Sequence, residues 1–262
     1  MKTNNNTCKI LVVVTFIIMV TVNALANILP INGVGTGEVS DSFPNLFAPA
    51  GLTFSIWGLI YILLALFAIY QTGLFSKDKT TVNSEWLRKV GFLFVLSSMA
   101  NTVWIFAWHY KIIELSLIMM LVILGSLLSI SLIIKRQRLS KAEYFFIKIP
   151  FGVYFGWITV ATIANITTQL VDWGWNGFGL SDQLWTIIVL IAGVAIGVST
   201  VISNRDWAYG LVLVWAYAGI LIKHLSQTGF EGTYTGVIIT AIASIALFAL
   251  ASLVPVFAKK KE

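Results

Sequence analysis

The sequence predicts an all-α, polytopic membrane protein built as a bundle of about eight transmembrane helices. Of its 262 residues, 58% are hydrophobic and only 11% are charged, whereas a soluble domain carries roughly 25% charged residues. Apolar runs of about 20 residues, the length that crosses the hydrocarbon core of a bilayer, recur along the whole chain. The basic residues cluster in the gaps between these runs. Together these observations exclude an ordinary soluble domain.

Eight apolar segments follow from the hydropathy pattern, with ends defined to within several residues. They are 9–28, 50–70, 89–108, 112–134, 145–170, 184–202, 207–222 and 235–257. If all eight cross the membrane, every Lys and Arg except Lys111 and Lys223 falls at a terminus, in a gap on one side, or within the first four residues of a segment beside such a gap. Lys77 and Lys79 and the tail Lys259–Lys261 are among them.

This charge bias predicts the placement of the chain in its membrane. Because basic loops stay in the cytoplasm, both termini are predicted to be cytoplasmic. We expect an integral protein of a bacterial plasma membrane that has membrane lipids as partners. The net charge of +6 does not predict nucleic-acid binding, because the topology accounts for the basic residues.

The first apolar segment allows two interpretations. Its short apolar run and the small-residue stretch Ala24-Leu25-Ala26 are typical of a cleaved signal peptide. Asn23 and Asn27, however, could form hydrogen bonds inside a helical bundle. We favour a retained helix and keep cleavage as the alternative.

The segment between Pro30 and Pro49 is the longest gap on the side with few basic residues. It contains Glu38 and Asp41 and no Lys or Arg, and its length is unusual between packed helices. It is either a disordered connector or a lid folded back over a cavity.

Three of the apolar segments carry aromatic side chains along one helical face. Residues spaced by three, four or seven positions share such a face. Taken singly, the aromatic residues suit a membrane-interface belt, and an Asn suits a hydrogen bond between helices. The three faces consist of Phe54, Trp57 and Tyr61; of Asn101, Trp104 and Trp108; and of Tyr154, Trp157, Ala161 and Asn165.

The sequence offers few groups for catalysis or metal binding. The single cysteine, Cys8, allows no internal disulfide and no cysteine-based metal site. His109 and His224 fall at predicted helix ends, which argues against ligation of a haem iron. No predicted span has a charged residue near its centre for an ion relay. We therefore expect neither an enzyme nor an ion-coupled transporter.

The three aromatic faces, in this order, resemble the TspO/MBR family of tryptophan-rich sensory proteins, also called translocator proteins or peripheral benzodiazepine receptors. The resemblance rests on Pro49, Gly51 and the ten residues of the three faces, together with Phe106. It covers roughly residues 9–170 and departs from the family where Pro49-Ala50 stands for a Pro-Pro pair. It implies a five-helix TspO-like membrane core over residues 1–170, followed by a further three-helix membrane region over residues 171–262.

The resemblance also implies a function. Members of the family bind tetrapyrroles or other flat hydrophobic ligands in a cavity among the helices, and no cofactor is firmly implied beyond such a porphyrin. We expect a receptor or sensor, with a facilitative transporter of a small hydrophobic compound as the alternative. Photochemical breakdown of a bound porphyrin is kept as a minor alternative, and a second copy of the chain is kept open as a partner. The ligand-binding residues are predicted to be Phe54, Trp57, Tyr61, Asn101, Trp104, Trp108, Tyr154, Trp157, Ala161 and Asn165.

Overall fold

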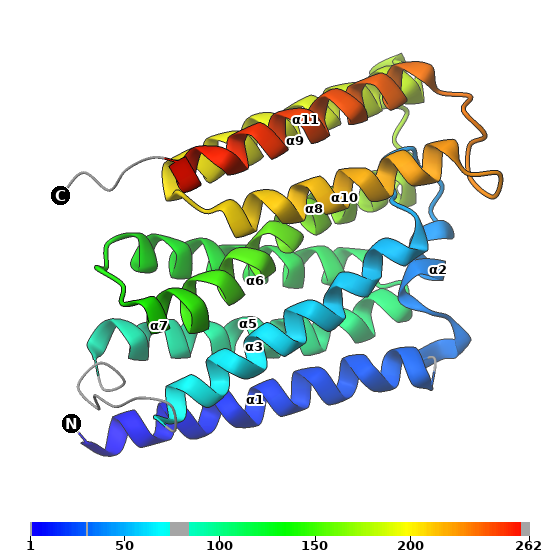
Figure 1. Ribbon diagram of the computed structural model, residues 1–262. Helices are drawn as coiled ribbons and strands as arrows, with labels where there is room; N and C mark the ends of the chain where they lie inside the picture. The colour runs from blue at the N-terminus through cyan, green and yellow to red at the C-terminus, as the bar shows by residue number, and fades with distance from the viewer. Residues whose placement is uncertain (1, 30, 74–83, 258–262) are drawn as a thin grey trace. The chain divides into compact units, whose positions relative to one another are not determined.

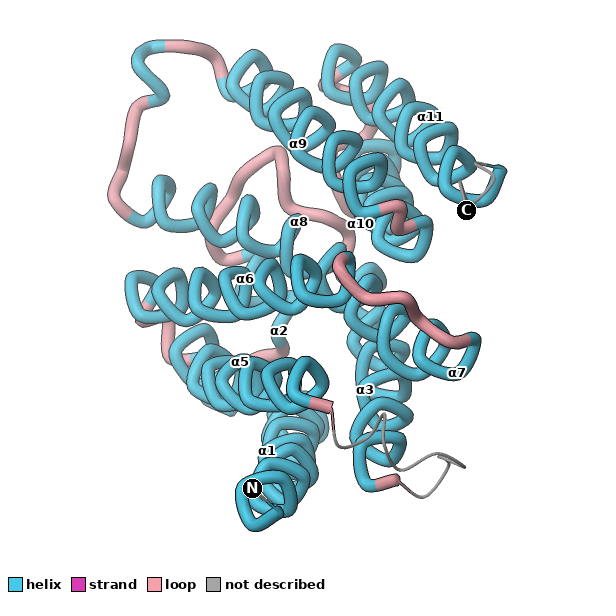
Figure 2. The backbone as a smooth tube through the Cα atoms, turned by 90° about the vertical axis from the view of Figure 1, so that its left-hand side faces the viewer, coloured by secondary structure: helices cyan, strands magenta, loops and turns pink. Residues whose placement is uncertain are grey.

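The computed structural model describes residues 2–29, 31–73 and 84–257, and within them the chain is mostly helical (Figure 1). The eight long helices are α1 (Lys2–Ile28), α3 (Ile56–Thr72), α5 (Glu85–His109), α6 (Ile113–Lys135), α8 (Ile149–Asp172), α9 (Asp182–Asn204), α10 (Trp207–Leu225) and α11 (Thr235–Phe257). The shorter ones are η1 (Ile31–Gly33), α2 (Thr36–Asp41), η2 (Gly51–Ser55), α7 (Lys141–Glu143), the π-helical turn η3 (Tyr144–Lys148) and η4 (Gly177–Gly179). Loops join them at their ends, and no strand occurs in the described part of the chain (Figure 2).

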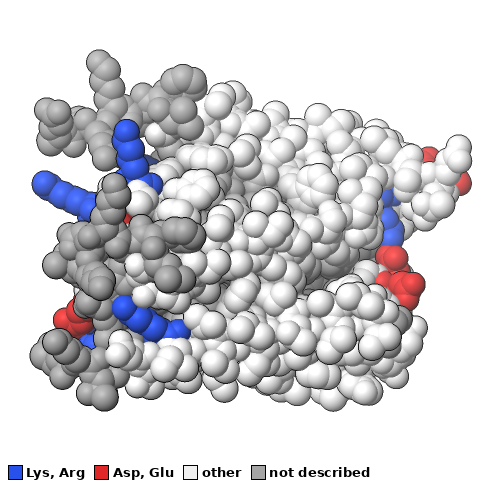
Figure 3. Space-filling model, turned by 60° about the horizontal axis from the view of Figure 1, so that its bottom comes forward, with Lys and Arg blue, Asp and Glu red and all other residues white. Residues whose placement is uncertain are grey.

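The predicted fold class is confirmed. Within the described residues, eight helical stretches are long and apolar enough to cross a membrane, as the apolar segments predicted. On the face shown in Figure 3, the Lys, Arg, Asp and Glu side chains of the described residues lie at the ends of helices, and the surface between is uncharged. Lys77, Lys79, Pro30 and the tail Lys259–Lys261 lie outside the described residues, so their predicted roles stay predictions.

The chain divides into two compact units, each built from two stretches of sequence. Unit 1 consists of Met1–Gly35 and Ile56–Phe155, and unit 2 of Thr36–Ser55 and Gly156–Glu262. Helix α8 contributes its first turns to unit 1 and the remainder to unit 2. The domain boundary predicted near residue 170 stays a prediction.

In unit 1, α5 packs against α1 and α6, and α1 also packs against α3. Gly91 of α5 permits a close approach: a Cβ atom there would lie 2.8 Å from Sγ of Cys8 on α1 and would overlap the Gln71 amide of α3. On the same helices, the rings of Phe67 and Phe94 pack edge to face at 5.3 Å between centroids. Small and aromatic side chains thus set the helix packing of this unit.

The helical stretch that leads into α8 begins with a capping box, in which Ser140 and Glu143 bond to each other's backbone N–H groups at 3.2 and 2.6 Å. The π-helical turn η3 follows, directly before Ile149 and Pro150. A proline lacks the N–H of a regular helix, and its ring crowds the carbonyl one turn earlier. The wide turn accommodates this defect, so the helical stretch runs through the proline.

In unit 2, α11 packs against α9 and α10. The GxxxG pair of α9 lies in this packing: the Tyr217 hydroxyl of α10 lies against Gly193, and Phe248 of α11 lies 2.6 Å from the position that a Cβ atom of Gly197 would take. Larger side chains at either position would separate the helices.

Candidate functional site

Six of the ten predicted ligand-binding residues come together in unit 1. They form a group, here called the Trp57 cluster, around one indole ring of α3. Its members are Trp57, Tyr61, Asn101, Trp104, Trp108 and Tyr154.

The rings of the Trp57 cluster lie within contact of one another. The Trp57 ring stacks on Tyr61 at 5.5 Å and 23°, and it lies 6.1 Å from Trp104 and 6.0 Å from Tyr154. Trp104 in turn stacks on Trp108 at 5.8 Å. Both stacked pairs are four residues apart on their helix, the spacing that puts side chains above one another. The cluster therefore follows from periodicity within α3 and α5 and from the packing of α8 beside them.

The polar centre of the cluster is Asn101, which is fully buried. Its Oδ1 accepts a hydrogen bond of 2.8 Å from Nδ2 of Asn23 on α1, and its Nδ2 donates to the Tyr154 hydroxyl at 3.5 Å. Asn101 thus joins three helices, as the interhelical alternative for this residue predicts. Sequence reasoning did not place Asn23 at the site, although an Asn within an apolar span is the signal that points to such a contact.

Two polar atoms of the cluster are buried without a hydrogen-bond partner among the described residues. They are the indole Nε1 of Trp104 and the Tyr61 hydroxyl. The Trp104 residue is only 4% exposed. A buried polar group left unpaired costs about 1–3 kcal/mol, and such groups are rare enough in native proteins to require an explanation. Both atoms can donate to an acceptor on a bound molecule.

The other four predicted residues belong to unit 2. The rings of Phe54 and Trp157 pack edge to face at 5.9 Å, and Asn165 is buried on the same helix as Ala161. The contact between Phe54 and Trp157 joins η2, at the start of the second predicted span, to α8 within unit 2. Whether they bind the same ligand as the Trp57 cluster stays a prediction.

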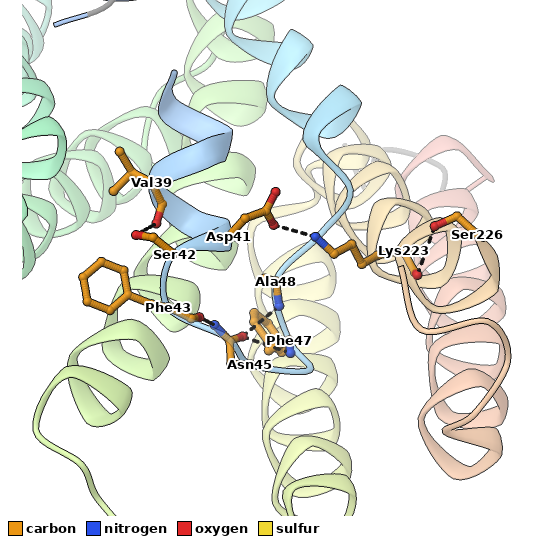
Figure 4. Close-up of polar contacts among 9 residues, drawn as sticks. All are labelled: Val39, Asp41, Ser42, Phe43, Asn45, Phe47, Ala48, Lys223 and Ser226. Atoms are coloured by element: carbon orange, nitrogen blue, oxygen red, sulfur yellow. Dashed lines mark hydrogen bonds and ion pairs between the residues drawn. The ribbon is translucent and has the colours of Figure 1, made fainter. Parts of the chain in front are cut away.

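The long segment before the second span is folded and not a disordered connector. Its turn is organised by Asn45, whose Oδ1 accepts hydrogen bonds from the backbone N–H groups of Phe47 and Ala48 at 3.1 and 2.9 Å (Figure 4). Asp41 forms a salt bridge with Lys223 of α10 in the same view. We call residues 36–55 the strap.

The strap is fastened along one face of α10. Gly219 accepts a hydrogen bond of 3.0 Å from the Ala50 N–H, and the Trp215 Nε1 donates to the Thr53 carbonyl at 3.0 Å. His224 contacts the Leu46 carbonyl through Nε2 at 2.9 Å. Trp215, Gly219 and Lys223 recur every four residues and so share a helix face. The sequence gives little sign of this docking, because most of the partners on the strap are backbone atoms.

The two histidines hold backbone segments. His109 of unit 1 contacts the Ile31 carbonyl through Nδ1 at 3.2 Å, and its own carbonyl accepts from Asn32 at 3.1 Å. In the part of the chain that the structure describes, no three His, Cys, Asp or Glu residues are grouped to hold a metal ion. The geometry of the Trp57 cluster suits an aromatic ligand site.

Comparison with known families matches residues 9–254 to the TSPO-like protein family. The matched range includes the last three helices, which the resemblance to a five-helix bundle did not cover. No curated protein and no solved structure is significantly similar to the chain. The family match extends over nearly the whole sequence and agrees with the membrane-spanning helices and their aromatic faces. The chain belongs to the family of TSPO-like membrane proteins.

Proposed function

We propose that this membrane protein is a receptor or sensor that binds a flat hydrophobic ligand of the tetrapyrrole class at the Trp57 cluster. The observation that carries the proposal is the pair of unpartnered polar atoms, on Trp104 and Tyr61, within a group of contacting aromatic rings. A ligand that offered acceptors to these two donors would offset the cost of leaving them unpaired.

The rings supply binding energy for a planar ligand. Offset-stacked or edge-to-face aromatic contacts contribute about 0.5–1.5 kcal/mol each beyond the burial of their area. Trp57 has three ring neighbours in the cluster, so a planar ligand beside it exchanges ring–ring contacts for ring–ligand contacts at little cost. The ligand then gains from leaving water.

The polar atoms supply orientation. A ligand that carries a carbonyl or carboxylate oxygen at its edge would accept hydrogen bonds from the Trp104 Nε1 and the Tyr61 hydroxyl. These bonds would satisfy donors that are otherwise buried and unpaired. Pockets that are mostly apolar with a few convergent polar groups are the usual form of small-molecule sites. Ring contacts and hydrogen bonds, without iron ligation, hold the ligand in this proposal.

The test is a titration of protoporphyrin IX into the purified protein in lipid nanodiscs, followed by quenching of tryptophan fluorescence. Trp57→Ala removes up to three ring contacts and is expected to weaken binding by about tenfold to a hundredfold. Trp104→Phe keeps a ring but removes the Nε1 donor, so it is expected to weaken binding by roughly tenfold. The matched control is Trp173→Ala, because Trp173 is 65% exposed and lies outside the cluster.

Unchanged affinity in both cluster variants would show that the site lies elsewhere. The same proteins in proteoliposomes separate sensing from transport. A receptor produces no flux of the ligand across the bilayer, whereas flux that is lost in Trp57→Ala would assign facilitative transport to the cluster instead.

A further inference from the structure

Unit 2 contains a pocket that the proposed function does not use. It has a volume of about 240 Å³ and lies where the end of α8, the start of α9, the α10–α11 connection and the strap turn meet. Its walls include four aromatic residues and one carboxylate: Trp175, Trp185, Phe230, Tyr234 and Asp182. The pocket is smaller than the roughly 300–1,000 Å³ of sites for drug-sized ligands, so it suits a small molecule.

The aromatic walls form two perpendicular pairs. The rings of Trp175 and Trp185 meet at 71° with centroids 4.7 Å apart, and those of Phe230 and Tyr234 meet at 83° and 5.5 Å. His224, itself buried, packs on Phe230 at 4.7 Å and so supports that wall. All four rings line one pocket, and a group of aromatic rings around one space is the arrangement that recognises ammonium groups.

The charges around the pocket are mostly negative. Asp182 is the only Asp, Glu, Lys or Arg in its lining, and it forms no ion pair with any described residue. At this end of the helices of unit 2 the other described charged residues are four carboxylates and a single lysine, Lys223, which is engaged by Asp41. The four carboxylates are Glu38, Asp41, Asp172 and Glu231.

A carboxylate in the first helical turn also stabilises α9 through the helix dipole, and that role alone would explain Asp182 on a plain surface. It would not explain a hollow lined by four rings beside it. A hard metal ion does not fit such walls, because Ca²⁺ requires six to eight oxygen ligands. An anion would be repelled by the carboxylates.

We propose that this pocket binds a small organic cation with a quaternary ammonium or alkylammonium group, held by the four rings and neutralised by Asp182. The cation comes either from a free amine in solution or from the choline headgroup of a lipid, because the pocket lies at the ends of membrane-spanning helices. This site is independent of the Trp57 cluster, so its failure would leave the tetrapyrrole proposal untouched.

The test is calorimetric titration of choline into the protein in a non-ionic maltoside detergent at fixed ionic strength. The reference ligand is 3,3-dimethylbutan-1-ol, which has the shape of choline without its charge. Saturable binding of choline is expected, with the neutral isostere roughly tenfold weaker. Equal affinity for both ligands, or no saturable binding of choline, would overturn the proposal.

Variants assign the binding to this pocket. Asp182→Asn and Trp185→Ala are each expected to weaken choline binding by about tenfold, and Asp182→Glu, which keeps the charge, is expected to retain most of it. Glu85→Gln removes an exposed carboxylate of α5 in unit 1 and is the matched control, with an unchanged affinity expected. Thermal unfolding first confirms that the Asp182→Asn variant is folded. If this variant then binds choline as tightly as the unaltered protein does, the assignment to this pocket is contradicted.

A competition arm identifies the source of the cation. If phosphatidylcholine added to the micelles displaces choline, the natural occupant is a lipid headgroup. If phosphatidylcholine leaves choline binding unchanged, the occupant is a free amine. Either result supports an organic-cation site.

Discussion

The buried contact between Asn23 and Asn101 can be tested as a free energy. Asn101→Leu keeps the side-chain size and removes both interhelical hydrogen bonds of the cluster, those to Asn23 and to Tyr154. Hydrogen bonds between membrane helices contribute about 0.6 kcal/mol on average and at most about 1.7 kcal/mol. The Tyr154 bond is long at 3.5 Å, and Asn23 still donates to the Met19 carbonyl at 2.9 Å. We therefore expect a loss of about 1–2 kcal/mol in the free energy of unfolding.

The measurement is unfolding of the purified protein in mixed micelles by titration with a denaturing detergent, followed by tryptophan fluorescence. A double-mutant cycle with Asn23→Leu and Asn101→Leu isolates the pair, and its coupling energy is expected to be about 0.6–1.7 kcal/mol. Asn27→Leu is the control, because among the described residues the Asn27 side chain bonds to the Asn23 carbonyl of its own helix and to no other helix. A coupling energy below about 0.3 kcal/mol would refute the inference that the bond between Asn23 and Asn101 holds α1 against the Trp57 cluster.

Three further predictions concern the strap, the helix packing and the topology. In Gly219→Ala the new Cβ atom would lie 2.6 Å from Cγ2 of Thr53, so hydrogen exchange of the strap amides should become faster. The control Gly125→Ala, whose Cβ atom would meet nothing within 4 Å, should leave this exchange unchanged. Equal exchange rates in the two variants would contradict the docking of the strap on α10. In Gly193→Ala the new Cβ atom would collide with the Tyr217 hydroxyl, so the free energy of unfolding is expected to fall by about 1–3 kcal/mol. The same detergent titration measures it. A loss below about 0.5 kcal/mol would show that α9 and α10 are not closely packed at Gly193. Reporter fusions at the two ends should both report a cytoplasmic position, and opposite signals would disprove the predicted even number of crossings.

The spans and the aromatic spacing of the site were predictable from the sequence because both depend on local periodicity. An apolar run of about 20 residues has few alternatives to a membrane helix. Likewise, Trp57 with Tyr61 and Trp104 with Trp108 lie one turn apart, and the structure stacks each pair. Contacts within a turn follow from spacing alone.

The contacts between distant segments were not predictable in this way. Trp215 and Thr53 are separated by 162 positions, and the acceptor is a backbone carbonyl, which every residue possesses. The same holds for His224 and the carbonyl of Leu46. The cation pocket draws on four separate segments, so no local pattern indicates it. Such features depend on which helices pack together, and periodicity does not determine that.

Binding of a planar hydrophobic ligand at the Trp57 cluster is best tested by a structure of the protein with bound protoporphyrin IX. We predict a porphyrin plane in contact with the Trp57 ring and a ligand oxygen roughly 2.7–3.2 Å from the Trp104 Nε1. A porphyrin bound to a lipid-facing surface, with the Trp104 donor still unpaired, would contradict it.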